Sequence, residues 1–420
     1  MLSPVISRRK FFTLSGAAAL AGLAPRFGRA DGLLPNPLTR LNAATAAVNA
    51  FATDLFRHYA GEKGEQKGNL FFSPFSIETA LAMTAAGARG DTLGEMQKTL
   101  HLPEDPHAAF GDLITRLSPP AGDKKDRPYE LSVANAIWAQ KDFPWEKDFA
   151  ALTRKNYGAG MVPVNFAASE AARKEINAWV EKETKEKIKD LIPPGVIDNL
   201  TRMVLANAIY FKSNWAVQFD KKLTKDAPFT RDDGSKTDVP LMSLKARFNY
   251  GRVLFGGRAG VLADVLEMPY AGKDLSMLVY LPEKPGETAK LIDRFATGTA
   301  ELRDTEVEVL LPRFKAESAL SLKPALTELG MKKAFVSGQA DFTGMSPQGK
   351  ELFIAAVLHK AFVEVNEEGT EAAAATAVVV KGKGLPPKPA VFRADRPFVF
   401  AIRDNATGAV LFLGRYAGPN

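Results

Sequence analysis

The 420-residue sequence contains no cysteine and only four histidines, at positions 58, 101, 107 and 359. Without cysteine, neither a disulfide framework nor a thiol nucleophile is available. The histidines do not fall in a His-Glu-x-x-His metal pattern, and no Gly-x-Ser-x-Gly turn marks a hydrolase serine. No run of about 20 uncharged apolar residues is present, so no segment of the mature chain is expected to span a membrane. The sequence therefore predicts no catalytic residue, no metal ligand and no cofactor.

The first 30 residues have the features of a twin-arginine export signal. Arg8-Arg9-Lys10 precedes a short apolar segment, residues 13–23, and Gly28-Arg29-Ala30 offers a small-residue cleavage site. An amphipathic first helix is the alternative. Export by this route carries folded proteins and implies a bacterial source and a periplasmic or secreted destination. Because the leader holds five basic residues and no acid, residues 31–420 have a net charge of only +2. General nucleic-acid binding is therefore not expected.

A stretch near the C-terminus, residues 365–387, combines features of a helix and of a strand. Four consecutive alanines favour a helix by propensity. At a period of two residues, however, one face carries only small side chains, those of Thr370, Ala372, Ala374 and Thr376. A strand with such a face is able to slide between two others, and Gly369 suits a pivot. A surface loop of small residues is the third interpretation.

Within this stretch, Glu-Glu-Gly-Thr-Glu-Ala-Ala-Ala-Ala-Thr resembles the hinge of the reactive-centre loop in inhibitory serpins. The resemblance implies a hinge made of Glu367, Glu368, Gly369, Thr370, Glu371, Ala372, Ala373, Ala374, Ala375 and Thr376, in a reactive-centre loop covering about residues 367–390. Counting from the hinge glycine puts the reactive bond between Lys383 and Gly384. Two or three extra residues before Phe398 leave Lys381 and Leu385 as alternatives.

Further motifs are similar to the same family in the same order over residues 40–420. Asn69-Leu-Phe-Phe-Ser-Pro-Phe-Ser-Ile77 resembles the serpin shutter strand and helix, and residues 203–215 resemble the third strand of the central sheet. The resemblance implies an α+β serpin fold with a large central, mostly antiparallel sheet, two further sheets, about nine helices and an exposed reactive-centre loop. A single domain over residues 31–420 is expected.

Local patterns predict individual elements of this fold. Apolar residues at helical spacing predict helices over residues 41–59, 171–192 and 320–331. A helix over residues 78–88 is expected to be capped by Ser76. His359 lies among apolar residues of a predicted strand, which is typical of a buried, hydrogen-bonded core histidine.

The resemblance also implies two clusters of functional residues. The shutter, which controls opening of the central sheet, consists of Ser73, Ser76, Asn207 and His359. The breach, at the top of the sheet, consists of Trp215, Arg313 and Glu367. For the Arg313–Glu367 pair, an ordinary surface ion pair is the alternative.

The function implied by the resemblance is irreversible suicide inhibition of serine peptidases. Lys383 before the reactive bond favours a trypsin-like target, and the expected partner is that peptidase in a covalent acyl complex with a monomeric inhibitor. Three alternatives are a non-inhibitory carrier or chaperone, a simple protease substrate, and a secreted hydrolase. A carrier would not need the small residues of the hinge, and a hydrolase would show turnover.

Overall fold

The computed structural model of the chain describes residues 36–61, 64, 66–117, 128–158, 160–255, 261–294, 302–370 and 389–419. From residue 36 onward they belong to one compact unit. The expected export signal lies outside the described residues. So do the hinge residues from Glu371 to Thr376 and the candidate reactive-bond residues Lys381, Lys383, Gly384 and Leu385.

Within these ranges the chain forms seven α-helices and fifteen strands, interspersed along the sequence, and the α+β class is confirmed. The helices are α1 (Pro37–Ala60), α2 (Pro74–Ala85), α3 (Gly90–Thr99), α4 (Pro106–Leu117), α5 (Lys147–Tyr157), α6 (Ser169–Glu183) and α7 (Lys323–Glu328). The strands are β1 (Leu70–Phe72), β2 (Tyr129–Gln140), β3 (Met161–Val164), β4 (Met203–Asn214), β5 (Lys225–Thr230), β6 (Lys236–Phe255), β7 (Val261–Pro269), β8 (Leu275–Pro282), β9 (Arg303–Pro312), β10 (Phe314–Ser321), β11 (Ala356–Val365), β12 (Gly369–Thr370), β13 (Ala390–Arg393), β14 (Phe398–Asp404) and β15 (Val410–Tyr416). The described α-helices are slightly fewer than the nine expected.

The strands form two sheets. The sheet expected to be central has six strands in the order β10-β11-β12-β4-β2-β3, and only the β11–β4 and β2–β3 pairs are parallel. The other nine strands are hydrogen-bonded into one sheet, in which β5 pairs with β6 beside the path β1-β15-β14-β8-β7-β6-β9-β13. The two further sheets that were expected are joined because β6 is 20 residues long. It pairs with β9 over residues 241–250 and with β7 over residues 249–255.

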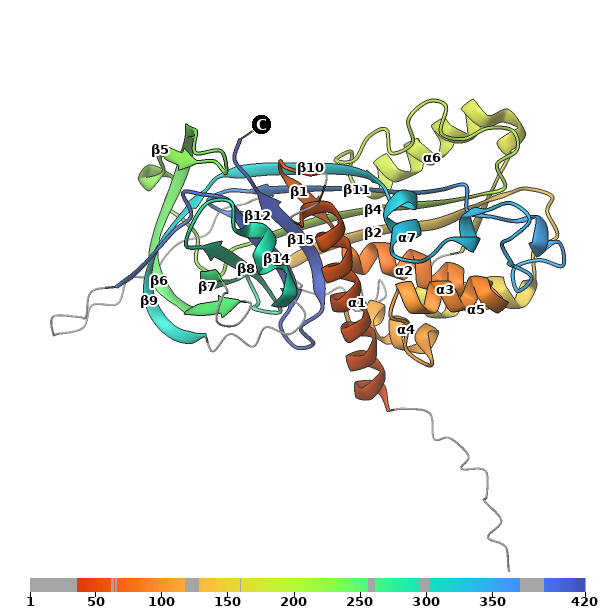
Figure 1. The fold of residues 1–420 in the computed structure, drawn as a ribbon, viewed down its shortest axis with the longest axis horizontal. Helices are drawn as coiled ribbons and strands as arrows, with labels where there is room; N and C mark the ends of the chain where they lie inside the picture. Colours follow the sequence, from red (N-terminus) through yellow and green to blue (C-terminus); the bar gives the residue numbers. More distant parts are fainter. Residues whose placement is uncertain are drawn as a thin grey trace, which may run out of the picture. The chain divides into compact units, whose positions relative to one another are not determined.

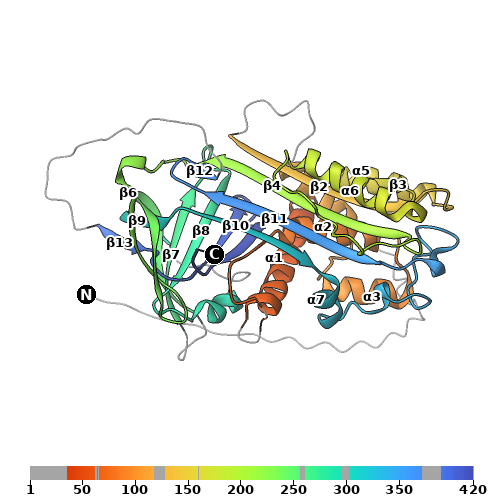
Figure 2. The ribbon, with the colours of Figure 1, turned by 90° about the horizontal axis from the view of Figure 1, so that it is seen from above.

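The six-stranded sheet lies between helices. Helix α6 covers β2 and β4 on one face, and α2 packs against the same two strands on the other face (Figure 1). In the view from above, β10, β11, β4 and β2 run side by side, with β12 at one end of β11 and β4 (Figure 2). No helix in the described part of the chain is long and apolar enough to cross a membrane.

Strand β4 is buried on both of its faces. Successive side chains of a strand point to opposite faces. Val204, Ala206 and Ala208 accordingly join a small core shared with Ile176 of α6. Leu205, Ile209 and other odd-numbered residues of β4 point into the main core on the opposite face. Both faces of this strand therefore meet protein, which explains the continuous apolar run in the sequence.

Helix α2 begins earlier than expected, and Ser73 rather than Ser76 caps it. The Ser73 side chain accepts a hydrogen bond from the backbone N–H of Ser76 at 3.1 Å. Pro74 occupies the first helical turn, where its fixed φ suits a helix start and its missing N–H costs nothing. The expectation of a Ser76 cap was therefore wrong by three residues.

Helix α6 ends at Glu183, although a helix as far as residue 192 was expected. Lys185 and Glu186 adopt left-handed backbone angles, with φ of 52° and 62°, which stop the helix. The following chain is held by Asn177, whose side chain bonds both the N–H (2.8 Å) and the carbonyl (3.0 Å) of Ile192. Ile192 is therefore buried without being helical.

The helix expected over residues 320–331 covers only α7, residues 323–328. Leu320 and Ser321 instead end strand β10, where they pair with His359 and Leu358 of β11. Pro324 lies in the first turn of the shortened helix. The helical spacing of apolar residues correctly predicted a helix here, but at its N-terminal end the pairing of β10 with β11 keeps residues 320 and 321 in a strand.

Candidate functional site at the opening of the six-stranded sheet

Strands β11 and β4 are joined along one half of their length and separated along the other. They pair directly in parallel from Ala356 to Ala361 of β11. Further along, β12 lies between them, with Thr370 paired to Val365 of β11 and to Ser213 of β4. The start of the predicted hinge therefore already forms two residues of an additional strand, antiparallel to both neighbours.

Glycine is the only residue type that fits at position 369, in the gap between β11 and β4. A Cβ atom there would lie 2.1 Å from the carbonyl oxygen of Ser213 and 2.5 Å from Cα of Asn214. Both contacts are to backbone, which cannot swing aside as a side chain can. Glycine is thus required for the close approach of β12 to β4.

The turn that joins β11 to β12 is anchored through its backbone to the segment after β4. The Trp215 N–H donates to the carbonyl of Glu368 and the Phe219 N–H to the carbonyl of Glu367, each at 2.9 Å. The indole N–H of Trp215 donates to the carbonyl of Asn366 at 3.0 Å. The Gln218 side chain adds a fourth bond, to the carbonyl of Glu368 at 3.2 Å, so turn residues 366–368 are held by four hydrogen bonds from one neighbouring segment.

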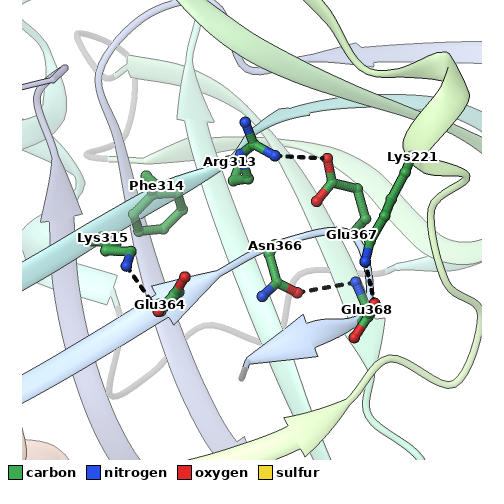
Figure 3. A pocket seen from close by; sticks show the side chains of 8 residues that line it. All are labelled: Lys221, Arg313, Phe314, Lys315, Glu364, Asn366, Glu367 and Glu368. Carbon is green, nitrogen blue, oxygen red and sulfur yellow. Dashed lines mark hydrogen bonds and ion pairs between the residues drawn. The ribbon is translucent and has the colours of Figure 1, made fainter. Parts of the chain in front are cut away.

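The two glutamates of this turn point in different directions and meet different partners (Figure 3). The buried carboxylate of Glu367 accepts from the Thr224 hydroxyl at 2.8 Å, while Arg313 Nη1 is 3.5 Å away. Glu368 forms an ion pair with Lys221 at the surface, and this hydrogen bond raises the pKa of Lys221. The structure thus brings Arg313 and Glu367 together, with Thr224 as the closer partner of the carboxylate.

A surface pocket of about 400 Å³ adjoins the turn. It is lined by three basic side chains, three acidic ones, one phenylalanine and one asparagine: Lys221, Arg313, Lys315, Glu364, Glu367, Glu368, Phe314 and Asn366 (Figure 3). Lys315 and Glu364 form a further ion pair at 3.2 Å. Among the described residues no group of three or more His, Asp or Glu side chains is arranged to hold a metal ion.

Tyr270 contacts the hinge at Thr370. Its ring is stacked on that of Trp215, with centroids 4.6 Å apart and planes 10° apart. Its hydroxyl lies 2.9 Å from Thr370 Oγ1, and both side chains are buried. The breach residue Trp215 therefore contacts the hinge directly, through its backbone N–H to Glu368, and positions Tyr270, whose hydroxyl meets Thr370.

The four predicted shutter residues form one buried hydrogen-bond network. His359 and Asn207 are direct neighbours on β11 and β4, and their side chains are hydrogen-bonded. Asn207 donates to Ser76 Oγ at 2.6 Å. The Ser73 N–H donates to His359 Nε2 at 3.1 Å. The network therefore spans β11 and β4 and ties both strands to the start of α2.

The state of His359 follows from its partners. Because the Ser73 N–H can only donate, Nε2 must accept and the proton must sit on Nδ1, which donates to Asn207 Oδ1. Complete burial lowers the pKa of His359 to about 3. The imidazole is thus neutral at physiological pH, and a second proton on Nε2 would face the Ser73 N–H.

Several residues at this site were missed in the sequence. Asn135 of β2 accepts from Ser76 Oγ at 3.0 Å and from Asn207, so it is a fifth member of the shutter network. Thr224 and Tyr270 contact the hinge from segments whose local patterns give no functional signal. Asn366 lies next to the predicted hinge, but no role was assigned to it. Only the pairing of β2 with β4, which places Asn135 opposite Asn207, would have identified Asn135.

Comparison with known proteins gives the family. Residues 46–419 match the model of the family described as Serpin (serine protease inhibitor). The fold, the loop entering its six-stranded sheet and this match show that the chain belongs to the serpin family. The match places it among peptidase inhibitors rather than enzymes.

Curated relatives agree over most of the chain. The leukocyte elastase inhibitors of Equus caballus and Rattus norvegicus are 40% and 42% identical over 389 residues, which cover 89% of this chain and 99% of each relative. An uncharacterized serpin-like protein of the archaeon Thermococcus kodakarensis is 39% identical, covering 89% of this chain and 85% of its own.

Solved structures show the same fold. A highly specific serpin from the insect Tenebrio molitor has a TM-score of 0.75 and 32% identity, covering 91% of this chain and 98% of that one. Native protease nexin-1, solved with heparin, has a TM-score of 0.78 and 28% identity, covering 91% and 100%.

Proposed function

We propose that the protein is an irreversible inhibitor of serine peptidases, with trypsin-like specificity, that traps its target as a covalent acyl-enzyme. The observation that carries the proposal is the partly occupied gap between β11 and β4, in which Gly369 and Thr370 already form the start of a further strand. The small residues that follow, from Ala372 to Thr376, suit continuation of that strand.

The chemistry takes place at the bond between Lys383 and Gly384. The hydroxyl of the peptidase serine attacks the carbonyl carbon of Lys383 and gives its proton to the peptidase's own base. The peptide bond then breaks, and Gly384 leaves with a protonated amine, so that Lys383 is joined to the serine as an ester. Deacylation by water needs a triad aligned to fractions of an ångström. Insertion of the freed loop pulls the peptidase along and distorts that alignment.

The specificity is proposed from the residue before the reactive bond. A trypsin-like peptidase has an acid in its specificity pocket, which pairs with the side chain of Lys383 or of the alternative Lys381. Leu385 would instead suit a chymotrypsin-like pocket. The curated relatives are named for the inhibition of leukocyte elastase, and a lysine is the feature of this loop that favours a different target.

The shutter and breach have separate roles in the proposal. The hydrogen bond between His359 and Asn207 joins the two strands that must part for the loop to enter, so the network acts as a gate. Trp215, Arg313 and Glu367 hold the turn at which entry begins. No cofactor and no nucleic acid takes part, and the inhibitor acts as a monomer.

The location is proposed from the leader alone. Residues 1–30 direct twin-arginine export in a bacterium, and the mature protein from Asp31 is periplasmic or released. Replacing Arg8 and Arg9 by lysine in the full chain should keep the protein, with its leader, inside the cells. Export of that variant at the normal level would contradict the proposal.

The first experiment mixes the mature protein with excess trypsin and examines the products on a denaturing gel and by mass spectrometry. A covalent complex, together with a released peptide starting at Gly384, is the expected result. A peptide starting at Gly382 would move the reactive bond to Lys381, and a covalent complex with chymotrypsin but not with trypsin would favour Leu385. Complete cleavage without a complex would favour a simple substrate, or a carrier with a serpin fold.

A further inference from the structure

The chain reverses between β11 and β12 in only four residues, 366–369. The Asn366 N–H donates to the carbonyl of Gly369 at 2.9 Å, as in a two-residue hairpin loop. A hairpin of this kind is ordinarily closed by a second bond, from the last N–H to the first carbonyl. In this turn the carbonyl of Asn366 is occupied by the indole N–H of Trp215 at 3.0 Å.

The side chain of Asn366 supplies the missing acceptor. Its Oδ1 accepts from the Glu368 N–H at 3.0 Å (Figure 3). The same oxygen accepts from the Gly369 N–H at 3.2 Å. The asparagine thus uses its side-chain oxygen in place of its own carbonyl, as asparagine and aspartate do in turns. Without this side-chain oxygen, the N–H groups of Glu368 and Gly369 would lose their acceptor in the closed turn, and Gly369 is buried.

We propose that Asn366 is a positioning residue for loop insertion, because its side chain keeps the hairpin closed from which the cleaved loop extends into the sheet. The proposal rests on the function proposed above. The hairpin sets the register, since it places Thr370 opposite both Val365 and Ser213. Every later residue of the loop then follows that register, and slow initiation of a new strand is avoided.

The effect on the rate follows from a population shift. Removal of the Asn366 side chain destabilises the closed hairpin relative to an open form in which the hinge has left the sheet. In the open form, water can accept the hydrogen bonds of the Glu368 and Gly369 N–H groups. Insertion must start from the minor closed hairpin, and its rate falls by the fraction that remains closed. The Asn366 side-chain oxygen is one uncharged acceptor shared by two N–H donors. Its loss should reduce the closed fraction, and with it the rate of insertion, by about tenfold.

The test compares Asn366→Ala with Asn366→Asp in reactions with trypsin. Aspartate keeps an oxygen at the same position, so it should restore the turn. Asp233→Ala is the matched control, because Asp233 closes the β5–β6 hairpin through the same kind of side-chain bond, to the Ser235 N–H at 2.9 Å. The measured quantities are the rate of loop cleavage, the ratio of covalent complex to cleaved inhibitor, and the melting temperature of each native variant.

Asn366→Ala should lower the ratio of covalent complex to cleaved inhibitor about tenfold at an unchanged cleavage rate, whereas Asn366→Asp and Asp233→Ala should behave like wild type. A general loss of structure would lower the melting temperature of Asn366→Ala without rescue by aspartate. Wild-type trapping by Asn366→Ala would overturn the inference.

A second measurement separates this inference from the proposed function. If wild type forms no complex with trypsin, the proposed inhibition fails. Insertion is then followed without a complex, as the rise over time in the melting temperature of the protein after its loop has been cleaved. A slower rise for Asn366→Ala than for Asn366→Asp would still support the positioning role. Equal rates, or no rise in any variant, would refute it.

Discussion

The Tyr270 hydroxyl lies 2.9 Å from Oγ1 of Thr370, and this contact joins the hinge to a residue 100 positions earlier in the chain. Both side chains are buried, so neither hydroxyl has water as an alternative partner. The Tyr270 ring is fixed by its stacking on Trp215. The first threonine of the hinge is therefore met by a preformed and rigid hydrogen-bonding group.

Tyr270→Phe should destabilise the native protein by about 1 kcal/mol, because it leaves the Thr370 hydroxyl unpaired but keeps the stacked ring. Thr370→Val should have a similar effect from the other side. Since the double variant removes both hydroxyls, its cost should be clearly smaller than the sum of the two single costs. Urea unfolding of the four proteins measures this coupling, and strict additivity would show that the two hydroxyls do not interact.

Thr370→Arg should convert the inhibitor largely into a substrate. Thr370 is only 1% exposed, so an arginine there would place an unpaired cation between β12 and the core. The hinge would then leave the gap, and hydrolysis of the acyl-enzyme would overtake insertion. The ratio of complex to cleaved protein with trypsin gives the result. Gln97→Arg, which adds the same charge at an exposed position of α3, is the control.

The four described hinge residues, Glu367 to Thr370, and the four predicted shutter residues lie in segments that the sequence singled out, whereas the rest of the predicted hinge lies outside the described residues. The hinge motif is contiguous, and Ser73, Ser76, Asn207 and His359 each lie in a recognisable segment. The structure places these four side chains in contact, although their effect on opening of the sheet stays a prediction. These residues share the property that a local pattern marks the element on which they lie.

The residues that were missed have partners far away in the chain. Asn135 meets Asn207 through the register of β2 and β4. Tyr270 reaches the Thr370 hydroxyl from a position that is set by an isolated β-bridge between Tyr270 and Trp215. The end of α6 was also missed, because Lys185 adopts a left-handed angle without a glycine or proline to signal it. Such features depend on tertiary packing and not on local preference.

His359 should make the protein less stable in mild acid. Its pKa is lowered to about 3 in the folded protein, while the unfolded chain has the ordinary value of about 6.5. Between these values the unfolded state binds more protons, so the free energy of unfolding falls as the pH falls through this window. From pH 7 to pH 5 the loss should be about 2 kcal/mol.

His359→Gln removes this titration and keeps one donor and one acceptor. Urea unfolding at pH 7, 6 and 5 should show that the wild type loses about 2 kcal/mol more than the variant. Parallel pH profiles of wild type and His359→Gln would mean that the imidazole takes up a proton in the folded state.

Glu78 should make the protein less stable in the alkaline direction. It lies on α2, is fully buried, and neither carboxyl oxygen has a hydrogen-bond partner. Burial raises its pKa well above the usual value, so the folded state retains a proton that the unfolded chain has lost. The free energy of unfolding therefore falls as the pH rises from about 4.5 towards the raised pKa.

Glu78→Gln should abolish this dependence, since an amide has the same shape and does not titrate. Glu78→Met should go further and stabilise the protein by about 1–3 kcal/mol at pH 8, because it also removes the unpaired polar atoms. Urea unfolding between pH 5 and pH 9 tests both, with Glu175→Gln at an exposed position of α6 as the control. If Glu78→Met were less stable than wild type at pH 8, the carboxyl group would have to be ionised and paired inside the fold. A more stable Glu78→Met variant would show that the burial of this acid opposes the stability of the native fold.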